Sequence, residues 1–116
     1  MATADYRASV KNVAQSAQKT RLVVDLIRGK DVVEALEMLQ FLKNKASGPV
    51  YKVVRSAMIN AEENFGMSRH DLYIHTIYAD EGPTRKWRRF GARGRFKPWL
   101  RRSAQVTVIL REREEA

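Results

Sequence analysis

Apolar and polar residues alternate from Tyr6 to Lys11, with Tyr6, Ala8 and Val10 in one parity. This period of two predicts a short half-buried strand, which we expect at the edge of a sheet. Residues 72–79 and 105–110 are also strand-like, and the second of these segments is rich in Val, Ile and Thr. In the first of these two segments, simple alternation predicts two faces. One has Leu72, Ile74, Thr76 and Tyr78, and the other has Tyr73, His75, Ile77 and Ala79.

Two segments with helical spacing follow the first strand. Ser16 is predicted to cap the first, whose apolar stripe is Leu22, Val23, Leu26 and Ile27, and Gly29 is expected just past its end. Asp31 and Glu34 have the spacing of a capping box and predict the start of the second. Its expected apolar stripe is Val32, Leu36, Leu39 and Leu42.

A third helix is expected after the polar connection 43–45, with Ser47 or Gly48 as its cap and Pro49 in its first turn. Its apolar positions recur every three or four residues and comprise Val50, Val53, Val54, Ala57, Met58 and Ala61. The pattern fades at residues 64–66. Small and β-branched side chains on this stripe favour close packing of the helix on a sheet.

The two later strands flank residues 82–102, which contain Gly-Ala-Arg-Gly and predict a hairpin with its turn near 90–94. If both arms stay extended, each of about 15 residues spans about 50 Å, whereas a compact chain of this length has a radius of gyration near 13 Å. The hairpin should therefore project. The predicted fold is α+β: three helices packed on one face of a small three-stranded antiparallel sheet, with a long projecting β-hairpin.

A single domain of 116 residues is expected, with 1–81 and 103–116 as its globular part and 82–102 as an extended basic hairpin. The chain has 22 Lys and Arg residues and 13 Asp and Glu residues. Nine of the basic residues and none of the acidic ones lie within 82–102, so the net charge of +9 resides entirely in this stretch. Burying so many unpaired cations is prohibitive, and the stretch needs a polyanion to neutralise it.

Arginine outnumbers lysine in the hairpin stretch, which suits bidentate phosphate contacts. Trp87, Phe90, Phe96 and Trp99 lie between the cations and offer faces on which unpaired bases can stack. A solvated basic loop is the simpler alternative, but the clustered charge and the aromatics favour nucleic acid. Unstacked bases make structured RNA a better partner than B-DNA.

Lys19 and Arg21 lie in the first turns of the first helix, where the helix dipole disfavours cations. This placement suggests an external anion. A solvated helix face explains the same two residues equally well.

The sequence offers little for catalysis. It has no cysteine, and His70 and His75 are its only histidines, so no cofactor or metal site is expected. No phosphate-loop or nucleophile motif is present, and Asp80 and Glu81 are neighbours that a strand would point to opposite faces. An enzyme is not expected. No apolar run approaches the ~18 residues of a membrane span, and the N-terminus lacks an apolar signal core.

Taken together, these elements resemble the bacterial type of the large-subunit ribosomal protein twenty-two family. The resemblance covers roughly residues 6–110 and depends on the segments 16–29, 56–62, 80–84, 92–95 and 106–108 in this order. It implies a structural protein that binds large-subunit rRNA and aids ribosome assembly. It also implies a hairpin that reaches the wall of the nascent-peptide exit tunnel, near the constriction, and influences macrolide sensitivity.

By this resemblance and the composition, the expected RNA-binding residues are Lys11, Ser16, Lys19, Arg21, Arg85, Lys86, Trp87, Arg88, Arg89, Phe90, Arg93, Arg95, Lys97, Trp99, Arg101 and Arg102. The expected tunnel-facing tip is Arg88, Arg89, Phe90, Gly91, Ala92, Arg93, Gly94 and Arg95. The resemblance implies rRNA, other large-subunit proteins and the nascent polypeptide as partners. It implies a location on the ribosome, in the cytoplasm or in an organelle matrix. Neither a membrane nor a homo-oligomer is expected.

Two other classes stay open at this stage. A DNA-architectural protein could use a basic β-ribbon arm in the minor groove, usually as a dimer. A membrane-surface protein could use the same charge, although Gly91, Gly94 and Pro98 interrupt any amphipathic helix in this stretch.

Overall fold

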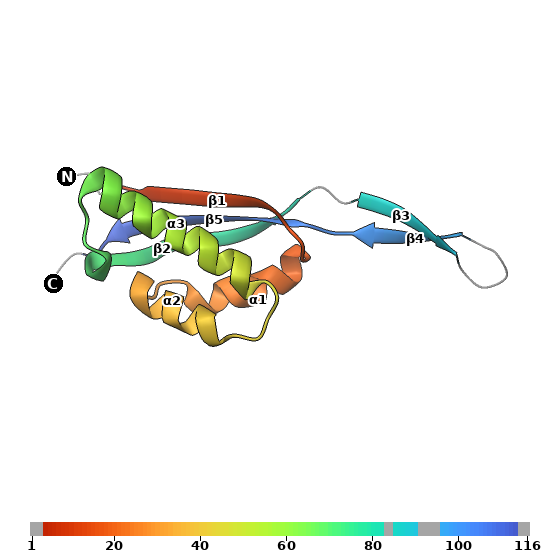
Figure 1. Cartoon of the computed structure of the whole chain (residues 1–116), viewed down its shortest axis with the longest axis horizontal. Helices are drawn as coiled ribbons and strands as arrows, with labels where there is room; N and C mark the ends of the chain where they lie inside the picture. Colours follow the sequence, from red (N-terminus) through yellow and green to blue (C-terminus); the bar gives the residue numbers. More distant parts are fainter. Residues whose placement is uncertain (1–3, 83–84, 91–95, 114–116) are drawn as a thin grey trace.

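The computed structural model describes residues 4–82, 85–90 and 96–113, and within 85–90 and 96–101 it describes the backbone (Figure 1). The elements follow one another as β1 (Tyr6–Val13), α1 (Ala17–Ile27), α2 (Val32–Phe41), α3 (Ser47–Phe65), the 3-10 turn η1 (Arg69–Asp71), β2 (Leu72–Glu81), β3 (Arg85–Phe90), β4 (Phe96–Arg101) and β5 (Ala104–Glu112).

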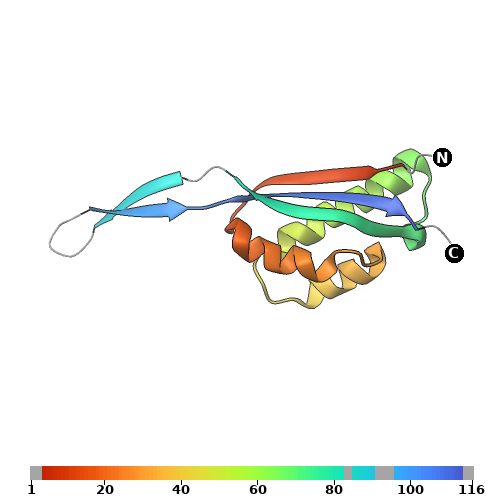
Figure 2. The same ribbon diagram turned by 180° about the vertical axis from the view of Figure 1, so that it is seen from behind.

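The larger sheet has three antiparallel strands in the order β1-β5-β2, so β1 is an edge strand as predicted. The three helices cover one face of this sheet, and Figure 2 shows the other face open. Between the two layers lies one core, which includes Val54 and Ala57 of α3 and Val106, Val108 and Leu110 of β5. The predicted α+β arrangement of three helices on a three-stranded antiparallel sheet is confirmed.

The predicted alternation along β2 is wrong beyond Ile74. Ile74 pairs with Leu110 and Thr76 pairs with Ile109, so a bulge at His75 shifts the register by one residue. A bulge of this kind inverts the parity of all later side chains. Leu72, Ile74, Ile77 and Ala79 are accordingly the buried residues of this strand.

Helix α1 begins where the sequence predicted, because the Ser16 side chain accepts a hydrogen bond from the Lys19 backbone N–H at 3.3 Å. It ends before Gly29, whose φ of +81° is in the left-handed region that glycine adopts without strain. The predicted apolar stripe is half wrong. Val23 and Ile27 are buried, whereas Leu22 is 63% exposed and Leu26 47% exposed. The buried face instead includes Ala17, Thr20 and Val24.

Asp31 is the N-cap residue of α2, as predicted, but the predicted capping box does not form, and the predicted cap of α3 is wrong. Asp31 occupies the N-cap position of α2 but makes no capping hydrogen bond there, because its Oδ1 accepts one from Arg113 Nε at 2.8 Å. Ala46 is the N-cap of α3, so Ser47 and Gly48 lie inside the helix. The Ser47 hydroxyl instead donates toward the Asn44 carbonyl, at 2.6 Å. The predicted buried stripe of α3 is confirmed, from Val50 to Ala61.

Strands β3 and β4 form a separate two-stranded antiparallel ribbon beyond the larger sheet. The ribbon lies at the end of the molecule where β1 ends and α1 begins (Figure 1). The molecule measures 66 × 26 × 22 Å along its principal axes and has a radius of gyration of 17.4 Å. This elongation agrees with the projecting hairpin that the sequence predicts. Its predicted turn near 90–94 lies almost entirely outside the described residues.

Candidate nucleic-acid interface

The register of the β3–β4 ribbon places like residues opposite one another. Arg85 pairs with Arg101, and Arg89 pairs with Lys97. Like charges directly across an antiparallel ladder destabilise the pair, and a two-stranded ribbon is marginally stable in water even without such repulsion. Within the ribbon, nothing acidic is available to offset these cations, because 82–102 contains no Asp or Glu.

Aromatic residues also fall opposite one another in this register, Trp87 with Trp99 and Phe90 with Phe96. Directly opposite positions of an antiparallel pair share a face, and successive pairs alternate between faces. One face of the ribbon therefore takes the pairs 85/101, 87/99 and 89/97, which together are four cations and two tryptophans. The other takes 86/100, 88/98 and 90/96. Both faces combine cations with rings.

The ribbon joins the larger sheet at a close approach of two backbones. The Gly82 N–H donates to the Ser103 carbonyl at 2.9 Å, just beyond the last pair of β2 and β5. A Cβ at Gly82 would lie 2.6 Å from the Ser103 Oγ. Glycine thus lets the two arms stay close at the point where the ribbon leaves the core.

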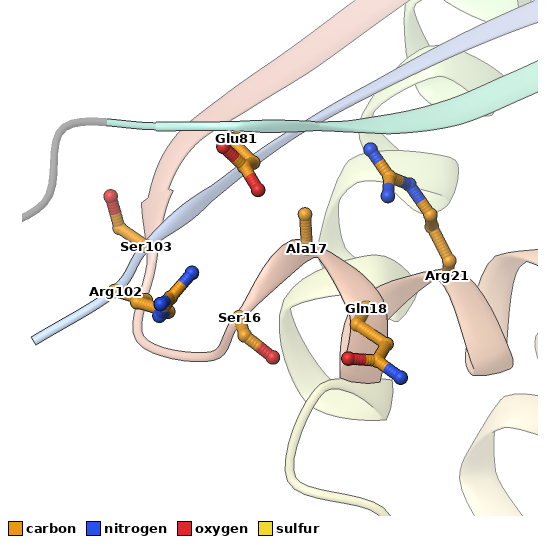
Figure 3. Close-up of a pocket in the computed structure, with 7 residues that line it drawn as sticks. All are labelled: Ser16, Ala17, Gln18, Arg21, Glu81, Arg102 and Ser103. Atoms are coloured by element: carbon orange, nitrogen blue, oxygen red, sulfur yellow. The ribbon is translucent and has the colours of Figure 1, made fainter.

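A groove of about 400 Å³ lies at this foot, between the start of α1 and the ends of β2 and β5 (Figure 3). It is lined by Ser16, Ala17, Gln18, Arg21, Glu81, Arg102 and Ser103. The Arg21 Nε donates to the Ala79 carbonyl at 3.0 Å, which fixes the base of this guanidinium against β2. Arg102 is exposed at the opposite side. The groove is therefore polar, with one fixed and one exposed arginine.

The structure brings three of the predicted RNA-binding residues to the groove: Ser16, Arg21 and Arg102. The Ser16 hydroxyl also stabilises the start of α1, because it caps this helix. Sequence reasoning missed Gln18, Glu81 and Ser103, because only the folded chain places them beside the helix start. Figure 3 shows Glu81 pointing into the groove from β2, so the groove itself is less cationic than the ribbon.

Lys11 and Lys19 lie outside the groove. Lys11 is exposed on β1, in the parity of Arg7 and Ser9 that faces away from the helices. Lys19 is exposed in the first turn of α1 and lines a smaller hollow of about 210 Å³ with Leu22 and Lys45. Neither lysine makes an ion pair within the described part of the chain. Both remain available to an external anion.

The remaining predicted residues belong to the ribbon or to its tip. Arg85, Lys86, Trp87, Arg88, Arg89 and Phe90 fall in β3, and Lys97, Trp99 and Arg101 in β4. The tip residues Gly91, Ala92, Arg93, Gly94 and Arg95 lie outside the described residues.

Other chemistry is sparse in the described residues. They contain no group of three His, Asp or Glu side chains that could hold a metal ion. None of their helices combines the length and apolarity needed to cross a bilayer. His75 stacks edge-on with Tyr73 and contacts Thr76 and Arg111 on the sheet surface, which is a packing role.

Comparison with known proteins points in one direction. Residues 8–111 match the family described as Ribosomal protein L22p/L17e. The chain is similar to "Large ribosomal subunit protein uL22" of Carboxydothermus hydrogenoformans, with 46% identity over 96% of this chain and 98% of the relative. It is also similar to the proteins of the same description from Dehalococcoides mccartyi, at 47% identity over 91% and 97%, and Pediococcus pentosaceus, at 46% over 94% and 92%.

Proposed function

This chain belongs to the Ribosomal protein L22p/L17e family, and from that premise we propose that it binds large-subunit rRNA through its basic ribbon and aids assembly of the subunit. It is a structural, non-enzymatic protein of the large ribosomal subunit that serves translation. Its partners are the RNA and proteins of the ribosome. The relatives named above are bacterial, which supports the cytoplasm as its location.

The observation that supports RNA binding most directly is the register of the ribbon. Two of its pairs place a cation opposite a cation, Arg85 with Arg101 and Arg89 with Lys97. Phosphates from separate RNA segments can neutralise both members of such a pair, and the counterions that they release favour binding. Arginine suits this role because its planar fork contacts two phosphate oxygens at once. The ribbon would thus hold RNA segments together that otherwise repel each other.

The groove at the foot extends the proposed contact surface toward the globular part. Arg102 on one side and Arg21 on the other could contact a phosphate backbone that passes the start of α1. Lys11 and Lys19 lie exposed on β1 and α1 and would add contacts on either side of it. The Glu81 carboxylate would repel a phosphate inside the groove, so the RNA backbone would pass along the rim of the groove.

The proposal includes the tunnel. Residues 88–95 form the predicted tip. The ribbon that leads to them starts where the strands β2 and β5 of the core sheet end. A strand pair of six residues adds about 20 Å to the reach of the globular part. We assign the tip to the tunnel wall by family membership, with the elongated shape of the molecule as support.

RNA binding is tested with two variants of equal charge change. The first replaces Arg85, Arg89, Lys97 and Arg101 by Gln, and the second replaces Lys30, Lys43, Lys52 and Arg55 by Gln in the helix layer. Both are titrated against large-subunit rRNA fragments and duplex DNA over a series of salt concentrations. Each lost phosphate contact lowers the logarithmic salt slope by ~0.7–0.9, so the ribbon variant should lose about three units and the helix variant less than one.

Equal losses in the two variants would show that the net charge matters and the ribbon does not, and the proposed interface would be wrong. Preference of the unaltered chain for duplex DNA would favour the DNA-architectural alternative. The tip is tested separately, with a photo-crosslinking residue at Ala92 in subunits that hold a stalled nascent chain. Crosslinks to the nascent chain or to tunnel RNA are expected, and a tip that reacts with neither would contradict the tunnel assignment.

A further inference from the structure

A second and larger groove lies in the helix layer, between α2 and α3. Its volume is about 630 Å³, and its lining comprises Leu39, Gln40, Leu42, Ser47, Gly48, Tyr51, Lys52, Arg55, Ser56 and Ile59. None of these residues belongs to the ribbon or to the foot groove. The lining therefore needs an explanation that RNA binding by the ribbon does not supply.

Most of the lining is one stripe of α3. Gly48, Tyr51, Lys52, Arg55, Ser56 and Ile59 recur at intervals of three, one, three, one and three residues, which is the spacing of a single helix face. This stripe adjoins the one that packs on the sheet, from Val50 to Ala61. It spans 12 residues and so about 17 Å at ~1.5 Å per residue, the length of a short helix laid alongside.

Part of the groove wall is apolar, and a hydrogen bond links its two sides. Leu42, Tyr51 and Ile59 are each partly exposed and pack against the core from outside. The Gln40 side chain donates to the Tyr51 hydroxyl at 3.2 Å, which links α2 to α3 across the groove. An open groove with apolar side chains in its lining is a candidate interaction surface.

The charge of the groove selects the kind of partner. Lys52 and Arg55 are exposed on its rim, and its lining contains no carboxylate. Neither cation takes part in an ion pair within the described residues. Apolar walls contribute nothing to a phosphate backbone, and two cations are few for a polyanion. The apolar lining and the two rim cations together fit an amphipathic segment whose apolar face enters the groove and whose flanks are acidic.

We propose that this groove binds an acidic amphipathic helix of another protein, with apolar anchors against Leu42, Tyr51 and Ile59 and carboxylates paired with Lys52 and Arg55. Gly48 and Ser56 leave room for the partner backbone, because their side chains are absent or small. The proposal goes beyond RNA binding, and it holds or fails independently of the ribbon.

The test uses the full chain and two synthetic peptides of 14 residues, each with Leu on one helical face. One carries Glu on both flanks of the Leu face, and the other carries Lys at the same positions. Binding is followed by fluorescence anisotropy at physiological salt. The Glu peptide should bind about fivefold or more tightly than the Lys peptide, as expected for two exposed ion pairs in place of two repulsions.

The decisive variant is the double reversal Lys52→Glu and Arg55→Glu, which should invert the preference so that the Lys peptide binds better. The matched control is Arg7→Glu and Lys11→Glu, the same charge change on the open sheet face, and it should leave the preference unchanged. Inversion in the first variant and not in the second supports the groove. Thermal unfolding of both variants checks that they are folded.

Three results would overturn the proposal. Binding of neither peptide would show that the groove is not a helix site. Equal shifts in the two double variants would trace the preference to net charge. The third result concerns a fluorescein-labelled uridine 12-mer: if the groove variant loses as much affinity for it as the ribbon variant, which changes the net charge by the same amount, the groove is an RNA surface. Loss of RNA affinity in the ribbon variant alone would leave the peptide result intact, so the two functions are tested separately.

Discussion

The core sheet β1-β5-β2 and the ribbon β3-β4 are built from the same antiparallel pairing and differ in what surrounds it. In the core sheet, β5 has a strand on each side and a layer of helices on one face, and Val106, Val108 and Leu110 are fully buried. In the ribbon, each strand has a single neighbour, and cations stand opposite cations. The first region contains its own stabilising contacts. On the proposed function, the second would obtain its stabilising contacts from rRNA.

The two regions also differ in whether their charges are balanced within the region. The described globular residues form five ion pairs, among them Arg28 with Asp25 and Arg69 with Glu62. The stretch 82–102 has nine basic residues and no acidic one. A region that pairs its charges internally can fold alone, whereas a region of one sign loses free energy by folding until an opposite charge arrives. We therefore propose that the boundaries at 82 and 102 separate a self-sufficient domain from a partner-dependent hairpin.

The largest effect is expected from a cavity in the core sheet. Leu110 is fully buried in the central strand and pairs with Tyr6 on one side and Ile74 on the other. Leu110→Ala should lower the free energy of unfolding by about 2–5 kcal/mol, a large share of the ~5–15 kcal/mol available to a domain. Urea unfolding measures this loss.

Deletion of residues 86–97 should leave a cooperative transition, and its disappearance would show that the ribbon belongs to the folding unit.

The two regions also differ in how well the sequence predicts them. The third helix was predictable almost residue by residue, because one stripe of α3 from Val50 to Ala61 meets the sheet along its whole length. The face of α1 was not. Leu22 and Leu26 are exposed while Thr20 is buried, since the position of α1 over the sheet, and not apolarity alone, decides which side is covered.

Local signals failed where a distant residue competed for the same atoms. The capping box at Asp31 and Glu34 has the right spacing, yet the Asp31 carboxylate contacts Arg113 at the far end of the chain. The bulge at His75 inverts the second half of β2, and no residue type near it announces a bulge. The charge of the ribbon was visible in the sequence. The register that sets Arg89 opposite Lys97 required the structure.

A smaller effect is expected when the ribbon is given an internal ion pair. Arg89→Glu places a carboxylate opposite Lys97, and such a pair should contribute about 0.2–1 kcal/mol where two cations now repel. Hydrogen exchange of the β3 and β4 amides should slow. RNA affinity should fall, with a salt slope smaller by about one unit. The control Arg7→Glu, opposite Ile109 in the core sheet, should change neither exchange in the ribbon nor its salt slope. Faster exchange in the Arg89 variant would contradict the inferred repulsion between Arg89 and Lys97.

The smallest effect concerns a charge pair of the globular region. The Arg111 Nε donates to the Asp5 Oδ1 at 2.5 Å and joins the start of the chain to the last strand. This hydrogen bond holds the pKa of Asp5 below its ordinary value of 3.8, against a weaker opposing effect of desolvation. Since the folded state has the lower pKa, the pair stabilises the fold fully above about pH 5 and loses this effect as the pH falls through the folded pKa.

The pair is tested by comparing the melting temperatures of the unaltered chain and Asp5→Asn between pH 2 and pH 7. The difference should be small and constant above about pH 5, because both groups are exposed to solvent, and should shrink toward zero below pH 3.8. Arg111→Gln should give the same profile, and the double variant should add nothing further. A difference that persists at pH 2 would show that Asp5 acts through packing and not through its charge. The ribbon has no carboxylate, so the protection factors of its amides, which are corrected for the intrinsic pH dependence of exchange, should not show this transition.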